Sequence, residues 1–250
     1  MKRLKDGLGE TMILEVQGVS KAFGGLIAVN NVTFNVKEKE IFGVIGPNGS
    51  GKTTLFNLIS GFLRTDSGKI IFNGEEITNL KASTICKKGI CKTFQLPRPF
   101  NNMSTIDNVM VGALLRTNNL EKARNKALEI IKFVGLEKKS NHKPFELTMA
   151  ERKILELSRA LATEPRVLLL DEVMAGLNPT EIEEMLSRIK KLKDQGITIL
   201  MIEHVMRAVM SICDRIMVLH HGEKIAEGKP VEIAENEKVI EAYLGARLFA

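Results

Sequence analysis

The sequence predicts an α/β fold with a mainly parallel sheet, an N-terminal antiparallel β part and a helical insert. In the last third of the chain, buried apolar strands alternate with amphipathic helices, which is typical of a parallel sheet. A glycine-rich loop at residues 46–53 follows an apolar strand and precedes a helical segment. The stretch 104–162 carries helical periodicity. With 250 residues, 44% of them hydrophobic, the chain can bury a full core.

The first ninety residues contain several short strands. "ILEVQGV" is followed by "VTFNV", in which Val32, Phe34 and Val36 alternate with polar residues, as in a half-buried strand. "IFGVIG" is continuously apolar, and "KIIFNG" follows the glycine-rich loop and its helix. These segments supply the antiparallel part and one buried strand of the main sheet.

The middle of the chain is predicted to be helical. "TIDNVMVGALL" follows a possible capping box from Ser104 to Asp107, and "EKARNKALEIIKFVG" ends at Gly135, a plausible C-cap. A third helix, "KILELSRALA", follows "LTMAER", where Thr148 and Glu151 have capping-box spacing. From these residues alone, "LTMAER" is either an ordinary helix start or an altered functional segment.

Strands and helices alternate in the remaining sequence. "VLLL" precedes a helix from Pro179 to Gln195 that ends at Gly196, and "ITILMI" precedes a helix near "HVMRAVMSI". "RIMVLHHGEKIAEG" is predicted to be a β-hairpin, and "VIEAYLG" a short final helix.

The composition excludes several classes of protein and of binding partner. The net charge of +6 comes from cations and anions interleaved along the chain, which favours a solvated surface over a nucleic-acid footprint. Cys86, Cys91 and Cys213 form no CxxC pair, so neither a disulfide framework nor a zinc site is indicated, and a reducing cytosol fits. No window approaches the roughly 18 apolar residues of a membrane span, so partners would have to hold the protein at a membrane.

The segment "GPNGSGKT" predicts a phosphate-binding loop. Its glycines allow backbone N–H groups to surround phosphates, Lys52 reaches the β and γ oxygens, and Thr53 offers a hydroxyl to Mg²⁺. The alternative is a glycine turn without a ligand, but the strand and helix on either side favour the phosphate loop. The predicted nucleotide-binding residues here are Gly46, Pro47, Asn48, Gly49, Ser50, Gly51, Lys52, Thr53 and Thr54.

Three more polar residues follow buried strands. Asp171 and Glu172 end "VLLLDE", at the sheet edge where open α/β sheets bind ligands; Asp171 would hold Mg²⁺, and Glu172 could accept a proton from attacking water. His204 follows "ITILMI" at the same edge and could contact a γ-phosphate. The alternatives are two surface carboxylates and a structural histidine, and the phosphate loop favours the functional interpretation. His142, His220 and His221 are assigned no role.

The kind of phosphate-loop protein stays open on these grounds. A GTPase should carry an N-K-x-D segment, and "NKAL" at 125–128 lacks its Asp. A small kinase would not need a Glu directly after the strand Asp.

Taken together, these segments resemble the ATP-binding cassette (ABC) ATPases over nearly the whole chain. The ATPase subunits of branched-chain amino-acid importers are the most similar group. The resemblance is carried by "FGGLIAVNNVTFNV", "GPNGSGKTTLFNLISGF", "GKIIFNGEEIT", "KTFQLPRPF", "LLLDEVMAGLNPTE", "IEHVM" and "AYLG".

The resemblance implies roles for residues outside the phosphate loop. Phe23 would stack on adenine, although a Phe packed under the first hairpin is the alternative. Gln95 would touch Mg²⁺ or the attacking water and join the sheet to the helical insert. "LPRPF", with Pro97 and Pro99, would line a groove for a coupling helix of a membrane subunit.

"LTMAE" stands where the family has its signature, Leu-Ser-Gly-Gly-Gln, whose helix points at the nucleotide of a second subunit. Thr148, Met149 and Ala150 would therefore contact ATP bound by the partner. Met149 and Ala150 replace the two glycines. Val173 replaces the usual Pro after the catalytic Glu, and Asn178 replaces the usual Asp of the D-loop.

The resulting prediction is an ATP- and Mg²⁺-dependent subunit of an importer for branched-chain or hydrophobic amino acids, peripheral at the cytoplasmic side of the cell membrane. Expected partners are two permease subunits, a second identical or paralogous ATPase and, indirectly, an external solute-binding protein, with no nucleic acid. Residues 12–250 would form one ABC domain, with a core of 12–94 and 163–250, a helical subdomain of 95–162 and an extension of 1–11. Alternatives are transport of urea or other amides, lipopolysaccharide export, or a nucleic-acid-associated ABC protein.

Overall fold

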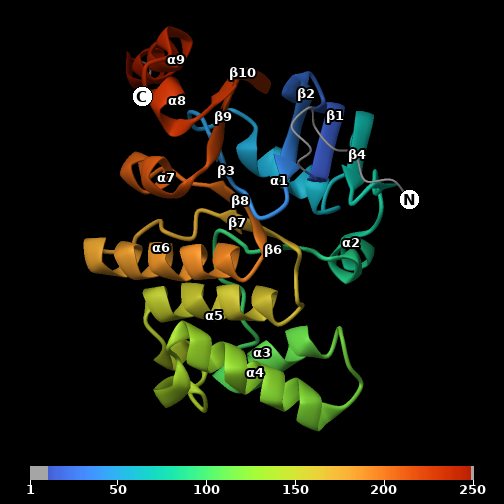
Figure 1. Ribbon diagram of the computed structural model, residues 1–250, viewed down its shortest axis with the longest axis vertical. Coiled ribbons are helices and arrows are strands. Elements are labelled where there is room, and N and C mark those ends of the chain that lie inside the picture. Colours follow the sequence, from blue (N-terminus) through green and yellow to red (C-terminus); the bar gives the residue numbers. More distant parts are fainter. Residues whose placement is uncertain (1–10, 249–250) are drawn as a thin grey trace.

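Two β-sheets and several helical layers build the molecule (Figure 1). The computed structural model describes residues 11–248, with side chains described for 11–243. The N-terminal sheet is antiparallel, in the order β2-β1-β4-β5. Its strands are β1 (Met12–Phe23), β2 (Leu26–Lys37), β4 (Ser67–Phe72) and β5 (Glu75–Glu76). The predicted antiparallel part is therefore confirmed.

The second sheet is mainly parallel, in the order β10-β9-β3-β8-β7-β6, with only β10 antiparallel to its neighbour. Its strands are β3 (Ile41–Ile45), β6 (Ile90–Lys92), β7 (Val167–Asp171), β8 (Thr198–Ile202), β9 (Arg215–His220) and β10 (Glu223–Gly228). Every residue of β3, β7 and β8 is buried, as their unbroken apolar sequences predict.

The two faces of this sheet pack into different cores. Phe42 and Val44 of β3 join a cluster with the antiparallel sheet and α1 (Lys52–Ile59). Ile41 and Ile45 point the other way and join a cluster with the helices below the sheet. Because successive strand residues face opposite sides, a continuous apolar run is what a strand covered on both faces requires.

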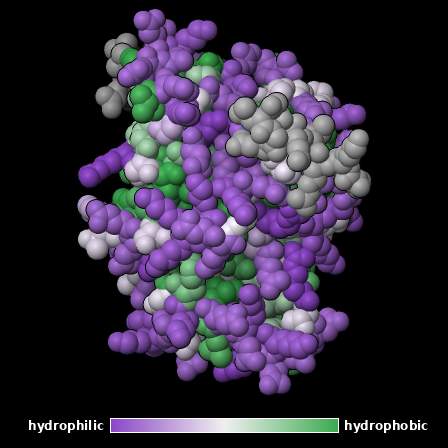
Figure 2. All heavy atoms as spheres, in the orientation of Figure 1, coloured by the Kyte–Doolittle hydropathy of each residue, from purple (hydrophilic) through white to green (hydrophobic). Residues whose placement is uncertain are grey.

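The helices below the sheet include α3 (Thr105–Ala113), α4 (Leu120–Val134) and α5 (Met149–Leu161). The predicted caps are confirmed: Ser104 Oγ accepts from the Asp107 N–H, and Gly135 ends α4 with a φ of 84°. Two short 3₁₀ turns, Glu137–Lys139 and Pro144–Glu146, connect α4 to α5. Figure 2 shows a mostly hydrophilic face with hydrophobic atoms gathered in two places, one in the upper left and one in the lower middle of the view.

The later helices alternate with the strands as predicted: α6 (Pro179–Asp194), α7 (Met206–Ile212) and α9 (Glu237–Leu248). Besides the two 3₁₀ turns, four elements are additional to the sequence prediction: α2 (Ala82–Lys88), β5, β6 and α8 (Pro230–Ala234). The final helix is longer than the segment "VIEAYLG", and α6 ends one residue earlier than predicted.

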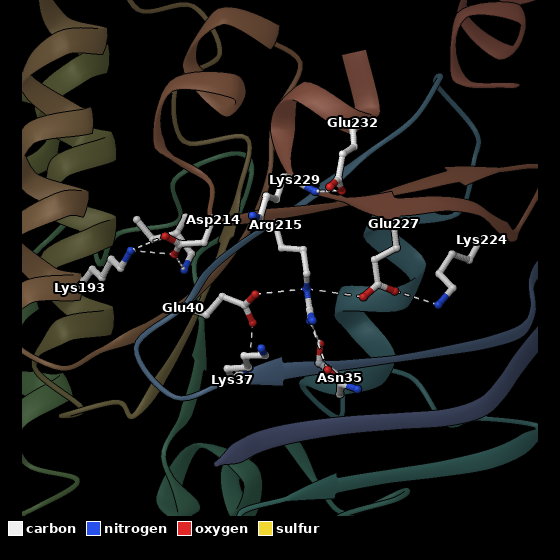
Figure 3. Close-up of polar contacts among 11 residues, drawn as sticks. Asn35, Lys37, Glu40, Lys193, Asp214, Arg215, Lys224, Glu227, Lys229 and Glu232 are labelled. Carbon is white, nitrogen blue, oxygen red and sulfur yellow. Dashed lines mark hydrogen bonds and ion pairs between the residues drawn. The ribbon is translucent and has the colours of Figure 1, made fainter. Parts of the chain in front are cut away.

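A group of charged residues joins the two sheets at the end of β3 opposite the glycine-rich loop (Figure 3). The Arg215 Nε lies 3.2 Å from Glu40 Oε1 and 3.5 Å from Glu227 Oε1, and its guanidinium also donates to the Asn35 carbonyl. Burial raises the pKa of the Glu40 carboxyl, and Arg215 opposes that shift. One guanidinium therefore connects β2, β9 and β10 to the residue preceding β3.

Within residues 11–248, no helix is both long and apolar enough to cross a bilayer. All but the last residue of the predicted N-terminal extension lies outside the described residues. The predicted division at residues 95 and 162 stays a prediction.

Candidate nucleotide site

The glycine-rich loop lies between β3 and α1 at the carboxyl end of the parallel sheet. Two glycines are required by close backbone contacts: a Cβ on Gly46 would lie 2.0 Å from the Leu219 carbonyl oxygen, and one on Gly51 would lie 2.1 Å from that of Ala28. Both also have φ angles in the left-handed region, 151° and 101°. The loop therefore leads directly into the N-terminus of α1, where backbone N–H groups and the helix dipole favour an anion.

Lys52, the first residue of α1, folds back over the loop. Its Nζ donates to the carbonyl oxygens of Gly46 at 2.8 Å and Pro47 at 2.9 Å. Burial lowers the pKa of this ammonium, and the carboxylates of Glu172 and Asp171 oppose the shift. The ammonium is thus positioned between the loop and the acidic end of β7.

A cleft of about 600 Å³ runs along the loop, within the usual size range of small-molecule sites. Its lining contains Phe23, Leu26, Ile27, Ala28, Asn48, Gly49, Ser50, Gly51, Lys52, Thr53, Thr54, Glu172, His204 and His221. Phe23 stands at the end of β1 and is 47% exposed, so the structure does not pack it under the hairpin. A ligand with a flat apolar group beside Phe23 and phosphates beside the glycine-rich loop would match this lining.

The three residues predicted to act on the γ-phosphate and water are in direct contact. Glu172 Oε2 accepts from Gln95 Nε2 at 2.6 Å, and Glu172 Oε1 lies 3.0 Å from His204 Nε2. The Glu172 side chain is 13% exposed, and its backbone adopts a φ of 52°, a left-handed conformation that side chains rarely adopt. Residues from the ends of β6, β7 and β8 therefore meet at one carboxylate.

Asp171 ends β7 and is 1% exposed. Its Oδ2 pairs with Lys92 Nζ at 3.0 Å, whereas its Oδ1 is buried without a hydrogen-bond partner. A buried carboxylate oxygen without a partner is costly unless a cation or water satisfies it. Thr53 is exposed in the cleft. A hard divalent cation that keeps several waters, such as Mg²⁺, fits this set of oxygen donors.

Thr148, Met149 and Ala150 lie elsewhere. They form the N-terminal turn of α5 and do not appear in the lining of the cleft within the described residues. Thr148 Oγ1 accepts from the Glu151 N–H, and the Glu151 carboxylate accepts from the Thr148 N–H at 2.8 Å, so the predicted capping box is confirmed. Met149 is 54% exposed. The turn therefore lies outside the cleft that carries the phosphate loop.

Two features were not predicted from the sequence. His221, with a φ of 47°, lines the cleft because the β9–β10 turn lies against the loop, where the Gly222 N–H donates to the Ser50 carbonyl. Glu203 and Lys153 are buried behind Glu172. Glu203 could have been noticed because it directly follows a buried strand. A lysine on a helix, in contrast, carries no sequence pattern that predicts its burial.

A buried strand, a glycine loop and a helix N-terminus beside two strand-end carboxylates define a P-loop nucleotide-binding ATPase. Comparison with known proteins narrows this class. The sequence profile described as "ABC transporter" matches residues 29–175, and that described as "Branched-chain amino acid ATP-binding cassette transporter" matches residues 223–248. The chain belongs to the ABC transporter family of ATP-binding cassettes, as its sequence predicts, and is an ATPase.

Relatives and solved structures agree with this assignment. The high-affinity branched-chain amino acid transport ATP-binding protein BraF of Pseudomonas aeruginosa is 40% identical over 249 residues, covering 93% of this chain and 98% of BraF. The probable LivG of Archaeoglobus fulgidus is 39% identical, with coverages of 94% and 96%. A nucleotide-free ATP-binding cassette from an ABC transporter superposes with a TM-score of 0.86 at 32% identity, covering 93% of this chain and 99% of the other. The ADP conformation of MJ1267, an ATP-binding cassette of an ABC transporter, gives the same TM-score and identity, with coverages of 94% and 99%.

Proposed function

We propose that this protein is the ATP-hydrolysing subunit of an importer for branched-chain or other hydrophobic amino acids. The observation that carries the catalytic part is the placement of Glu172 between Gln95 and His204 at the edge of the cleft. The similarity to BraF and LivG, whose names specify branched-chain amino acid transport, supports the solute class.

The geometry supports a definite division of roles. Phe23 stacks on the adenine, and the loop residues Gly46 to Thr54 surround the phosphates with N–H groups and the Lys52 ammonium. Glu172 accepts a proton from the attacking water, while His204 and Gln95 hold its carboxylate and orient the water and γ-phosphate.

Thr53, Asp171 and the Gln95 amide oxygen would hold Mg²⁺, which neutralises charge on the transferring phosphate. The partnerless Oδ1 of Asp171 is the structural observation that supports this. Thr53 offers its hydroxyl from the exposed first turn of α1.

Thr148 and Met149 are exposed and Ala150 is half-buried, which supports a dimer in which each α5 completes the site of a second ATPase, identical or paralogous. We infer that ATP binding closes this dimer and moves two permease subunits, with the protein peripheral at the cytoplasmic membrane face and a solute-binding protein outside. The exposed side chains Leu96 and Phe100, in the segment predicted to meet a coupling helix, are available for the permease contact.

The catalytic assignment is tested with Glu172→Gln. Mg²⁺-dependent ATP hydrolysis should fall at least about 100-fold while ATP binding is retained, since only the base is lost. Glu183→Gln, a matched change at an exposed site on α6, should hydrolyse ATP normally. Near-normal turnover of Glu172→Gln would refute the assignment.

The solute is tested in vesicles that contain the permease pair encoded with this chain. Uptake of leucine, isoleucine or valine driven by internal ATP supports the proposal. Uptake of urea instead, or outward movement of lipopolysaccharide, would select one of the other solutes. Salt-dependent binding of DNA or RNA by the purified chain would favour a nucleic-acid-associated ABC protein.

A further inference from the structure

Lys153 is a buried lysine with an unusual hydrogen-bond partner. It lies on the second turn of α5 and is 6% exposed, on the same face as the buried Leu157 and Ala160. Its Nζ donates to the main-chain carbonyl of Glu172 at 2.9 Å. Helix α5 is therefore bonded directly to the backbone of the residue that carries the proposed base.

The backbone of Glu172 needs such support. Its φ of 52° is a strained conformation for a residue with a side chain, and it persists only where neighbouring groups fix it. Its N–H donates to the Ile202 carbonyl on β8 at 2.9 Å. Its carbonyl accepts from Lys153 at 2.9 Å and from the Ala175 N–H at 3.3 Å. The N–H and the carbonyl of Glu172, on either side of its Cα, are thus each bonded to another element, and together these bonds set the direction of the carboxylate.

Glu203 holds the backbone just beyond Glu172. It is 1% exposed, and its Oε1 accepts from the Met174 N–H at 2.8 Å, two residues beyond Glu172. Burial lowers the pKa of the Lys153 ammonium, and the charges of Glu203 and Glu172 oppose that shift. The segment 172–174 is consequently held at two points. Lys153 donates to the Glu172 carbonyl, and Glu203 accepts from the Met174 N–H.

We propose that Lys153 is a positioning residue that holds the Glu172 backbone in its active conformation and links it to helix α5. The inference rests on the proposed role of Glu172. The N-terminus of the same helix carries Thr148, five residues before Lys153 and about 7.5 Å away along the axis. One rigid element therefore joins the turn expected to meet a partner's nucleotide to the base of this chain's own site.

The test compares steady-state ATP hydrolysis and equilibrium ATP binding for Lys153→Met, Lys153→Arg and the exposed control Lys190→Met. Methionine keeps an unbranched chain as far as the ε position and loses the donor. The kcat should therefore fall about 10- to 100-fold, with KM and the Kd for ATP within about twofold. Arginine, which can still donate to the carbonyl, should restore kcat to within about threefold of wild type. Lys190→Met should match wild type.

Each remaining outcome is decisive. An unchanged kcat in folded Lys153→Met, or equal losses in kcat and ATP affinity, would overturn the positioning role. If Lys153→Met does not fold, Lys153→Gln replaces it in the test. The Gln amide is one bond too short to reach the Glu172 carbonyl, so the same fall in kcat is expected. If neither folds, the residue is purely structural and the proposal fails. Wild-type protein without Mg²⁺-dependent ATPase activity, or normal turnover in Glu172→Gln, would instead refute the proposed function.

Discussion

Glu203 makes the stability of this protein depend on pH in a direction opposite to that of most carboxylates. Burial raises its pKa from 4.5 to about 7, while the bond from the Met174 N–H and the charge of Lys153 oppose the shift. The folded protein therefore binds this proton more tightly than the unfolded chain does. The stabilisation is fully present below pH 4.5 and is lost as the pH rises through about 7.

The magnitude follows from the size of the shift. Each pKa unit corresponds to about 1.4 kcal/mol, so the free energy of unfolding should fall by about 3 kcal/mol between pH 4.5 and pH 8 on account of Glu203 alone. In Glu203→Gln the side chain keeps its shape and does not titrate. The difference in unfolding free energy between wild type and this variant isolates the effect, because other titrating groups cancel.

The assay is urea unfolding followed by far-ultraviolet circular dichroism at several pH values from 5 to 8.5, since the chain has no tryptophan. The difference between wild type and Glu203→Gln should decrease steadily up to about pH 7 and then level off. Two parallel stability curves would refute the reasoning, because they would mean that Glu203 titrates alike in the folded and unfolded states.

Three further predictions concern packing, charge and ligand binding. Gly112→Ala should destabilise the protein by about 1–3 kcal/mol in urea unfolding, despite the helix preference of alanine, because the new Cβ would lie 2.5 Å from the Arg159 carbonyl; a gain in stability would contradict the packing. Arg215→Met should lower the free energy of unfolding by about 3 kcal/mol, because it leaves the buried Glu40 carboxylate without its partner. Breaking the exposed pair of Lys88 and Glu75 should lower it by under about 1 kcal/mol, and equal losses would contradict this difference between buried and exposed pairs. Phe23→Ala should weaken ATP binding about tenfold in calorimetry, and unchanged affinity would exclude stacking.

Sequence pattern predicted the fold well where local signals were strong. The apolar strands, the glycine loop and the caps at Ser104, Thr148 and Gly135 each depend on a few neighbouring residues. Helix α2 was missed because its N-cap is Lys81, which makes no side-chain cap hydrogen bond. Strand β6 is only three residues long and is defined by its pairing with β7.

The candidate site shows the same limit. Glu172 and His204 could be predicted because each follows a buried strand, and parallel strands end at one edge. The position of His221 depends on how the β9–β10 turn meets the glycine loop, and that of Lys153 on how α5 packs below the sheet. Such contacts join residues far apart in the sequence, so no local pattern contains them.

The strand order also determines when the nucleotide loop can form during synthesis. Strand β3, which leads into the loop, pairs only with β8 and β9, and these begin at Thr198 and Arg215. The antiparallel strands β1, β2 and β4 can pair with one another as soon as residue 72 has emerged from the ribosome. Lys52 is therefore translated early but waits for most of the chain before its loop is supported. A nascent chain that stalls before β8 would carry a complete phosphate-loop sequence and no site.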